Sequence, residues 1–258
     1  MVTIDLAGKT ALVVGGSRGI GAAIVELLCK AGAWCAFTHT GNPSHQARLT
    51  ELLDRLRDEG GGAHAEAVDA RDGARMRALA DRIVRERGRL DVLVCNAGMN
   101  TARPAEELTD AQWVESIELN LGTASVAVRA ALPTMLRQAY GRILLIGSSA
   151  VFDGGGGALD YAAAKAGMTG MMTYLCRAYA RKGILTNIVH PCVIETDLLR
   201  QRYAGEEARG KLTAQIPAGR LGKPEDVAGL VAFLASAWGD YIVGQEILAD
   251  GGRTRFGK

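Results

Sequence analysis

The chain has 258 residues, 48% of them hydrophobic, and its 30 basic and 28 acidic residues give a net charge of +2. This size and hydrophobic content allow one large α/β core and favour a single domain over residues 1–258. Because the charges are spread along the sequence, they argue against a nucleic acid or a membrane surface and favour a small-molecule partner. The sequence has no run of eighteen apolar residues and no basic, apolar leader, so we expect a cytoplasmic protein.

The cysteines argue against a disulfide framework and against a metal site. They are odd in number and lack C-x-x-C spacing, which is typical of reduced thiols. His190 has no second ligand at a metal-binding spacing, so we expect no metal. The five cysteines are Cys29, Cys35, Cys95, Cys176 and Cys192.

Apolar runs alternate with helical segments along the chain, which predicts an α/β protein with a doubly wound parallel sheet of about seven strands and helices on both faces. The irregular stretch near 195–221 is expected to be a lid over the cleft, with an ordinary surface excursion as the alternative. The expected strands lie near 10–15, 33–38, 63–68, 91–95, 142–147, 184–189 and 245–248, and the expected helices near 19–31, 44–59, 73–87, 109–138, 160–181 and 224–236.

A glycine-rich turn follows the first expected strand. Gly15, Gly19 and Gly21 form G-x-x-x-G-x-G in the segment GGSRGIG, just before an amphipathic segment. Residues without a Cβ atom allow a tight turn and the close approach of a pyrophosphate, whose charge is met by N–H groups at the helix start. The strand before the turn and the helix after it favour a dinucleotide site over a plain turn.

A hydroxyl, a phenol and an ammonium lie within eighteen residues, as Ser148, Tyr161 and Lys165 in SSAVFDGGGGALDYAAAK. If the segment 160–181 is helical, Tyr161 and Lys165 project from the same face. The ammonium would favour the phenolate and bring the phenol toward proton transfer at neutral pH. The same spacing also occurs on solvated helices, so this pair alone does not identify an active site.

Several motifs in register resemble the classical short-chain dehydrogenase/reductase family over nearly the whole chain. GGSRGIG is similar to its cofactor loop, CNAG to its N-N-A-G segment and PCVIETD to its P-G-x-x-x-T segment. The strings YAAAKAG, IETD and GRLGKPEDVA resemble the 3-oxoacyl-(acyl-carrier-protein) reductase-like branch. The resemblance implies a Rossmann-type fold and an NAD(P)-dependent oxidoreductase.

The resemblance also implies a catalytic tetrad of Asn120, Ser148, Tyr161 and Lys165. Tyr161 would be the general acid for a carbonyl oxygen held by Ser148, or the base in the reverse direction. Lys165 would lower the pKa of Tyr161 and hold the nicotinamide ribose, while Asn120 would orient a water beside Lys165. Two alternatives stay open: Ser149 faces the substrate in place of Ser148, and Asn120 only breaks or bends its helix.

The end of the second expected strand, AFTHTGN, favours NADP(H) as the cofactor over NAD(H). An NAD-binding member usually carries an acid there for the ribose 2′-hydroxyl, and this chain has none. Arg18 lies where related NADP-binding members place a cation, with a solvated loop residue as the alternative. The expected cofactor contacts are Gly15, Ser17, Arg18, Gly19, Ile20, Gly21, Thr38, His39, Thr40, Asp69, Ala70, Asn96, Ala97, Gly98, Tyr161, Lys165, Pro191, Val193, Ile194 and Thr196.

The resemblance implies that the substrate is a ketone or a 3-oxoacyl group, interconverted with a secondary alcohol by hydride transfer. Docking of acyl carrier protein stays open, because Lys182 fits one basic position of that branch whereas Ala139 falls at another. Cys192 replaces the usual glycine after Pro191 and is either a pocket-lining, oxidation-sensitive thiol or a small residue tolerated in the loop.

Two further expectations concern the class of protein and its assembly. A protein that binds NADP(H) as a sensor or scaffold without turnover is the alternative to an enzyme, and the intact tetrad argues against it. Related proteins usually form homotetramers, so we expect assembly through the helices near 109–138 and 160–181 and the last strand.

Overall fold

The sheet has seven parallel strands in the order β3-β2-β1-β4-β5-β6-β7, which confirms the expected architecture. The structure is a computed structural model that describes residues 3–203 and 205–257. β2 and β3 lie on one side of β1, and β4 to β7 lie on the other side. The direction in which strands are added therefore reverses between β1 and β4, and a crevice forms there at the carboxyl ends of these two strands. The strands are β1 (Thr10–Val14), β2 (Trp34–His39), β3 (Ala63–Ala67), β4 (Val92–Cys95), β5 (Gly141–Ile146), β6 (Ile184–Pro191) and β7 (Glu246–Ala249).

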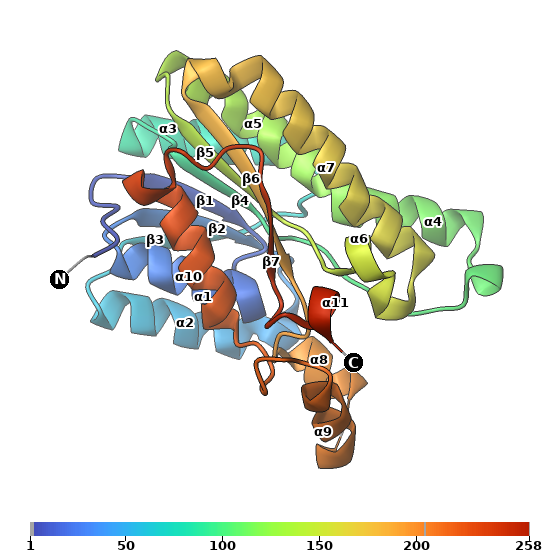
Figure 1. Cartoon of the computed structure of the whole chain (residues 1–258). Helices are drawn as coiled ribbons and strands as arrows, with labels where there is room; N and C mark the ends of the chain where they lie inside the picture. Colours follow the sequence, from blue (N-terminus) through green and yellow to red (C-terminus); the bar gives the residue numbers. More distant parts are fainter. Residues whose placement is uncertain (1–2, 204, 258) are drawn as a thin grey trace.

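Helices cover both faces of the sheet (Figure 1). All residues of β1, β4 and β5 are buried, and their nearly continuous apolar sequences are typical of a parallel sheet covered on both sides. Alternate residues of β1, β2, β4 and β5 divide between two apolar clusters, one on each face. One cluster includes α1 (Gly19–Lys30), α2 (Gln46–Asp58) and α10 (Pro224–Ala235), and the other α3 (Gly73–Arg87), α5 (Thr123–Arg137) and α7 (Leu159–Tyr179).

The single helix expected over 109–138 is interrupted. α4 (Asp110–Ile117) and α5 are joined by a π-helical turn over Glu118–Gly122. Asn120, which is fully buried in this turn, donates from its amide to the carbonyls of Ser116 and Met99. These bonds hold the wider turn in place, and π-helical turns occur frequently at functional sites.

The stretch near 195–221 is more regular than expected. It contains α8 (Asp197–Arg202) and α9 (Glu206–Ala214), which lie beyond one end of the sheet in Figure 1. The sequence expectation also omitted α6 (Ala150–Asp153) and α11 (Arg253–Phe256), which are single turns too short to show a period. Isolated 3₁₀ turns occur at Pro43–His45, Ala105–Glu107, Gly155–Gly157, Ala180–Lys182 and Ala237–Gly239.

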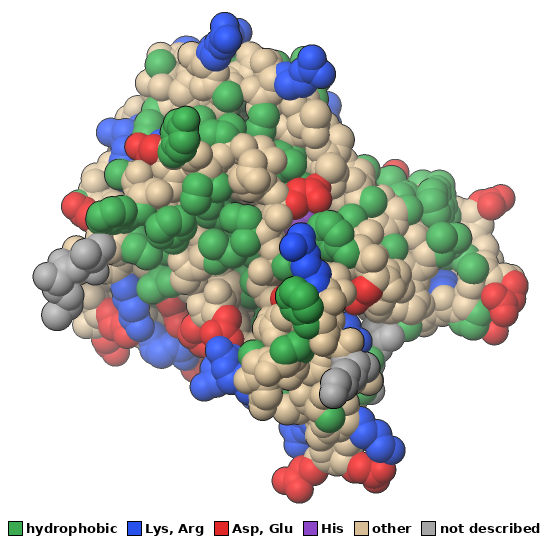
Figure 2. All heavy atoms as spheres, viewed as in Figure 1, with side chains coloured by type: hydrophobic (Ala, Val, Ile, Leu, Met, Phe, Trp, Pro, Cys, Tyr) green, Lys and Arg blue, Asp and Glu red, His purple; other side chains and the backbone are tan. Residues whose placement is uncertain are grey.

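Apolar side chains gather in two areas of the surface shown in Figure 2, one over α10 and one around α4 and α6. The large exposed apolar residues include Trp238 and Tyr241 after α10, and Trp113 and Val114 on α4. In the part of the chain that the structure describes, every helix is either too short or too polar to cross a membrane.

Candidate active site

The glycine-rich turn between β1 and α1 is held by side chains from two neighbouring strands. Thr38, in β2, accepts a hydrogen bond from the N–H of Gly15 at 3.0 Å, and Asn96, after β4, donates to the Gly15 carbonyl at 2.7 Å. Gly15 and Gly19 have positive φ angles, +82° and +54°, which favour glycine. A Cβ atom on Gly21 would lie 2.0 Å from the Gly15 carbonyl oxygen, so only glycine lets α1 approach the turn.

α1 begins directly at this turn, and no side chain caps its first N–H groups. Uncapped N–H groups at a helix start, next to a backbone that can be approached closely, suit a negatively charged phosphate group. This geometry fits the pyrophosphate of a dinucleotide.

A cleft of about 640 Å³ opens at the carboxyl ends of the strands, beside the glycine-rich turn. It is lined by segments that follow β1, β2, β4, β5 and β6, as expected for a doubly wound sheet. Most of the predicted site residues line it, namely Gly15, Ser17, Arg18, Gly19, Ile20, Thr38, His39, Thr40, Asp69, Ala70, Asn96, Ala97, Gly98, Ser148, Tyr161, Lys165, Pro191 and Thr196.

Four predicted residues do not line this cleft: Gly21, Asn120, Val193 and Ile194. Ile194 belongs instead to the hydrophobic core, where its side chain lies against Gly222. Val193 has φ = +51°, a conformation that is strained for a β-branched residue. The loop after β6 therefore turns these two side chains away from the cleft.

Ser148, Tyr161 and Lys165 come together on one wall of the cleft. Ser148 follows β5, while Tyr161 and Lys165 lie one turn apart on α7. Ser148 is close enough to Tyr161 to lower the pKa of its phenol. Lys165 donates to the Ile146 carbonyl at 2.8 Å, and its Nζ atom is 5.8 Å from the centre of the Tyr161 ring. Ser148, unlike the buried Ser149, lines the cleft.

Burial shifts the pKa values of both groups on α7. It raises the pKa of Tyr161, against a smaller lowering by Ser148, so the phenol is protonated at neutral pH. The expected lowering of this pKa by Lys165 is wrong in this structure, because burial dominates and the ammonium is bonded to Ile146 instead. Burial also lowers the pKa of Lys165 to about 8, although the nearby Cys95 opposes this shift.

Asn120 lies behind this wall. Its Oδ1 atom accepts from the N–H of Met99 at 2.9 Å, and its amide donates to the Met99 carbonyl at 2.9 Å. A Cβ atom on Gly98 would lie 2.6 Å from Asn120 Oδ1 and 3.3 Å from Lys165 Nζ. Both side chains thus lie directly beneath Gly98, and Asn120 ties the π-helical turn to the loop after β4.

The other end of the cleft carries several charged or titratable side chains. Arg18 lies 3.3 Å from a ring nitrogen of His45, and it forms no ion pair with a carboxylate in the ranges 3–203 and 205–257. Asp69 forms an ion pair with Arg71 at 2.7 Å, and hydrogen bonds from Arg71 lower the pKa of this carboxyl. Arg18 is therefore available for an external anion, whereas Asp69 and Arg71 neutralise each other.

Sequence reasoning missed nine residues of the lining. Arg71, Met99 and Asn100 directly follow predicted segments, so extending those segments by two residues would have found them. His45 and Leu119 reach the cleft from helical segments whose approach to the sheet no local pattern shows, whereas Asp197 directly follows the predicted residue Thr196. The complete set is His45, Val68, Arg71, Met99, Asn100, Leu119, Ile146, Gly147 and Asp197.

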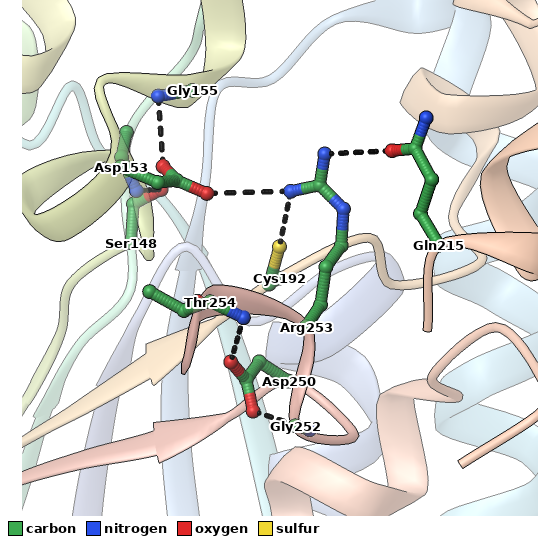
Figure 3. A network of polar contacts seen from close by, with 10 residues as sticks. Ser148, Asp153, Gly155, Cys192, Gln215, Asp250, Gly252, Arg253 and Thr254 are labelled. Atoms are coloured by element: carbon green, nitrogen blue, oxygen red, sulfur yellow. Dashed lines mark hydrogen bonds and ion pairs between the residues drawn. The ribbon is translucent and has the colours of Figure 1, made fainter. Parts of the chain in front are cut away.

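Arg253, on α11, joins three segments near Ser148 (Figure 3). Its guanidinium donates to Asp153 on α6 at 3.3 Å, to the Cys192 thiol at 3.4 Å and to Gln215 after α9 at 3.1 Å. Cys192 is buried and is not part of the cleft lining. In this structure it acts as a small residue that accepts a hydrogen bond, rather than as a pocket-lining thiol.

The described residues contain no group of three or more histidine, cysteine, aspartate or glutamate side chains that could hold a metal ion.

Comparison with known proteins places this site in context. Residues 14–254 match the family model described as enoyl-(acyl carrier protein) reductase. The chain is 38% identical over 249 residues to 3-oxoacyl-[acyl-carrier-protein] reductase FabG of Escherichia coli (strain K12), covering 96% of this chain and 98% of the relative.

Two solved structures show a similar fold with a nicotinamide cofactor. A putative NAD(P)-dependent gluconate 5-dehydrogenase from Beutenbergia cavernae, with bound NADP, is 35% identical, with a TM-score of 0.89 and coverage of 98% of this chain and 99% of that chain. A blue fluorescent protein from a metagenomic library, in complex with NADPH, is 39% identical, with a TM-score of 0.87 and coverage of 96% and 99%.

Proposed function

The chain belongs to the short-chain dehydrogenase/reductase family, and we propose that it interconverts a ketone and a secondary alcohol by hydride transfer with NADP(H). The observation that carries this proposal is the meeting of Ser148, Tyr161 and Lys165 on the wall of a cleft that also holds the glycine-rich turn. A proton donor and a dinucleotide-binding turn in one cleft suit reduction of a carbonyl group.

In the proposed mechanism the nicotinamide supplies the hydride, and side chains of the protein stabilise the negative charge that develops on the carbonyl oxygen. Tyr161 donates its phenolic proton to this oxygen, and Ser148 fixes the oxygen by a hydrogen bond. Lys165 places a positive charge near the phenolate that remains, and holds the ribose hydroxyls. Burial raises the pKa of Tyr161, so the phenol carries the proton that this step donates.

The preference for NADP(H) rests on the charges at the other end of the cleft. β2 ends in Thr38 and His39 without a carboxylate, and Arg18 is not neutralised by an acidic side chain of the described residues. A 2′-phosphate would bind Arg18 through charge-assisted hydrogen bonds. The solved neighbours with NADP and NADPH support the same preference.

The test of the cofactor preference is Arg18→Gln. Losing a charge-assisted hydrogen bond of about 1.5–3 kcal/mol should lower kcat/KM for NADPH about ten- to a hundredfold. The value for NADH should stay within about twofold, because NADH lacks the phosphate that Arg18 binds. A wild-type protein that prefers NADH would contradict the proposal.

The test of the reaction is Tyr161→Phe, assayed with a panel of ketones, 3-oxoacyl thioesters and secondary alcohols and with both cofactors. Removing the phenolic proton should reduce kcat by at least about a hundredfold, the contribution typical of a general acid. Tyr174→Phe is the matched control, because Tyr174 lies exposed on the same helix. Near-wild-type turnover of Tyr161→Phe would refute the mechanism.

The similarity to the E. coli relative makes 3-oxoacyl-carrier-protein reduction the second candidate.

The segment 195–221 is proposed to cover the substrate, since Arg253 connects its residue Gln215 to Asp153, five residues after Ser148. Assembly as a homotetramer is supported by two apolar areas of the surface, one on α4 and the start of α7 with Trp113, Val114 and Leu159, and one after α10 with Trp238 and Tyr241. Light scattering would test the assembly.

A further inference from the structure

A fully buried imidazole lies directly behind Ser148. His190 is the second-last residue of β6, has no exposed surface and is not part of the cleft lining. Its Nδ1 atom is 3.1 Å from the backbone nitrogen of Ser148 and 2.9 Å from the Ser148 carbonyl oxygen. The ring thus contacts the backbone of Ser148 and does not reach the reacting groups.

Both backbone groups of Ser148 lie within hydrogen-bond distance of the same ring nitrogen of His190. The Ser148 carbonyl already accepts from the N–H of Val151 at 3.3 Å, whereas the Ser148 N–H has His190 as its acceptor. On the other side of the ring, His190 Nε2 lies 3.9 Å from the Glu246 carboxylate. Nδ1 pairs with the Ser148 backbone in either tautomer: a bare Nδ1 accepts from the N–H at 3.1 Å, and a protonated Nδ1 donates to the carbonyl at 2.9 Å. Burial and Lys165 lower the pKa of His190, while Ser148 and Glu246 raise it, and the net lowering favours the neutral ring.

Glu246 also connects the imidazole to the helix that carries the other reactive groups. The second oxygen of its carboxylate, in β7, accepts a hydrogen bond from the Thr169 hydroxyl. Thr169 lies on α7, one turn beyond Lys165 and two turns beyond Tyr161. A chain of contacts therefore runs from the Ser148 backbone, through His190 and Glu246, to α7; its link between His190 Nε2 and Glu246 is an electrostatic contact at 3.9 Å and not a hydrogen bond.

The space around the imidazole is shaped for this contact. Gly147 precedes Ser148, and a Cβ atom there would lie 2.5 Å from His190 Nδ1. The Phe152 ring packs edge-on against the imidazole, with 5.0 Å between ring centres. The ring is thus enclosed from two sides and has little freedom to move.

We propose that His190 is a positioning residue that fixes the Ser148 backbone and, through Glu246 and Thr169, keeps Ser148 in register with Tyr161. It acts through Ser148 and does not exchange protons with the substrate. This inference rests on the carbonyl reduction proposed above for its kinetic consequences, and on the structure alone for its effect on the Ser148 backbone.

His190→Leu and His190→Asn test the role of the acceptor. Leucine fills a similar space but accepts no hydrogen bond, whereas Oδ1 of asparagine occupies the place of Nδ1 on the side chain. With the Ser148 hydroxyl misplaced, His190→Leu should lower kcat at least about tenfold while KM for NADPH stays within about twofold. His190→Asn should recover kcat to within about threefold of wild type.

Two further variants separate positioning from loss of core packing. Ile188→Val removes a methyl group from the same buried strand and should lower thermal stability without changing kcat beyond about twofold. Thr169→Val removes the hydroxyl at the far end of the chain of contacts and should lower kcat about threefold. Unchanged turnover of Thr169→Val would overturn the extension of the network to α7.

Hydrogen exchange at the Ser148 amide supplies a readout that does not depend on turnover. The N–H should exchange at least about tenfold faster in His190→Leu than in wild type, and at a near-wild-type rate in His190→Asn. Equal rates in wild type and His190→Leu would overturn the proposal, as would equal loss of kcat in the Leu and Asn variants. A wild-type protein that turns over no carbonyl would instead contradict the proposed function, and the exchange rates would still decide the role of His190.

Discussion

Lys165→Met is expected to stabilise the fold while abolishing activity. Lys165 is only 3% exposed, and among the described residues its ammonium donates a hydrogen bond to the neutral carbonyl of Ile146. Methionine has nearly the same length and shape but carries no charge that must leave water. A buried charge without an ionic partner is expensive for folding, so replacing it by an apolar side chain favours the folded state.

The size of the effect follows from the pKa of Lys165, which burial lowers from 10.5 to about 8. This shift of about 2.5 units corresponds to about 3 kcal/mol at 1.36 kcal/mol per unit. Loss of the hydrogen bond to Ile146 lowers the free energy of unfolding by about 1 kcal/mol. The net rise in the free energy of unfolding should therefore be about 2 kcal/mol at pH 7.

The pH dependence distinguishes this cause from better packing. In the unfolded chain the pKa of Lys165 is near 10.5, so between about pH 8 and 10.5 the unfolded state binds more protons than the folded state. Wild-type stability therefore rises with pH across this window relative to the variant. The advantage of Lys165→Met should nearly vanish by about pH 10.

Urea unfolding at pH 7 and pH 10 measures both quantities. Lys211→Met is the control, because Lys211 is an exposed lysine on α9 whose replacement should change stability by less than about 0.5 kcal/mol. A Lys165→Met protein that is less stable than wild type at pH 7, or whose advantage is the same at both pH values, would refute the argument.

Two other variants probe the turn and the C-terminal helix. Gly21→Ala should weaken NADPH binding at least about tenfold in a fluorescence titration, since its Cβ would meet the Gly15 carbonyl at 2.0 Å; unchanged affinity would contradict the tight turn. Arg253→Met should raise KM for the ketone severalfold and speed limited proteolysis within α9, because Asp153 and Gln215 lose their shared partner. Arg253→Lys should restore part of both effects, and wild-type behaviour of the methionine variant would argue against a substrate-covering role.

The sheet could be predicted because the central strands are continuous apolar runs that can be recognised in the sequence. TALVV, VLVC and GRILLI are buried on both faces, and a continuous apolar run of this length leaves few alternatives to a parallel strand. α8 and α9 were missed because they are short and only partly apolar. Thr196 before α8, and Glu206 and Glu207 in the first turn of α9, were nevertheless helix-start signals.

The meeting of Ser148, Tyr161 and Lys165 could be predicted from spacing, but their electrostatics could not. The i, i+4 relation places Tyr161 and Lys165 on one face of α7 without stating how deeply that face is buried. Burial decides the direction of both pKa shifts. The π-helical turn at Asn120 could not be predicted for a related reason, because the hydrogen bonds that hold it reach Met99, 21 residues away in the sequence.

The glycine before Ser148 has a consequence for how this protein can diverge. Because a methyl group on residue 147 would collide with the imidazole of His190, the two positions cannot change in an arbitrary order. A Cβ atom at 147 would also lie 2.9 Å from Ile188 Cγ2, so alanine at 147 requires a smaller side chain at 190 and a change at 188 as well. Positions 147, 188 and 190 should therefore show strong epistasis in a combinatorial mutant library.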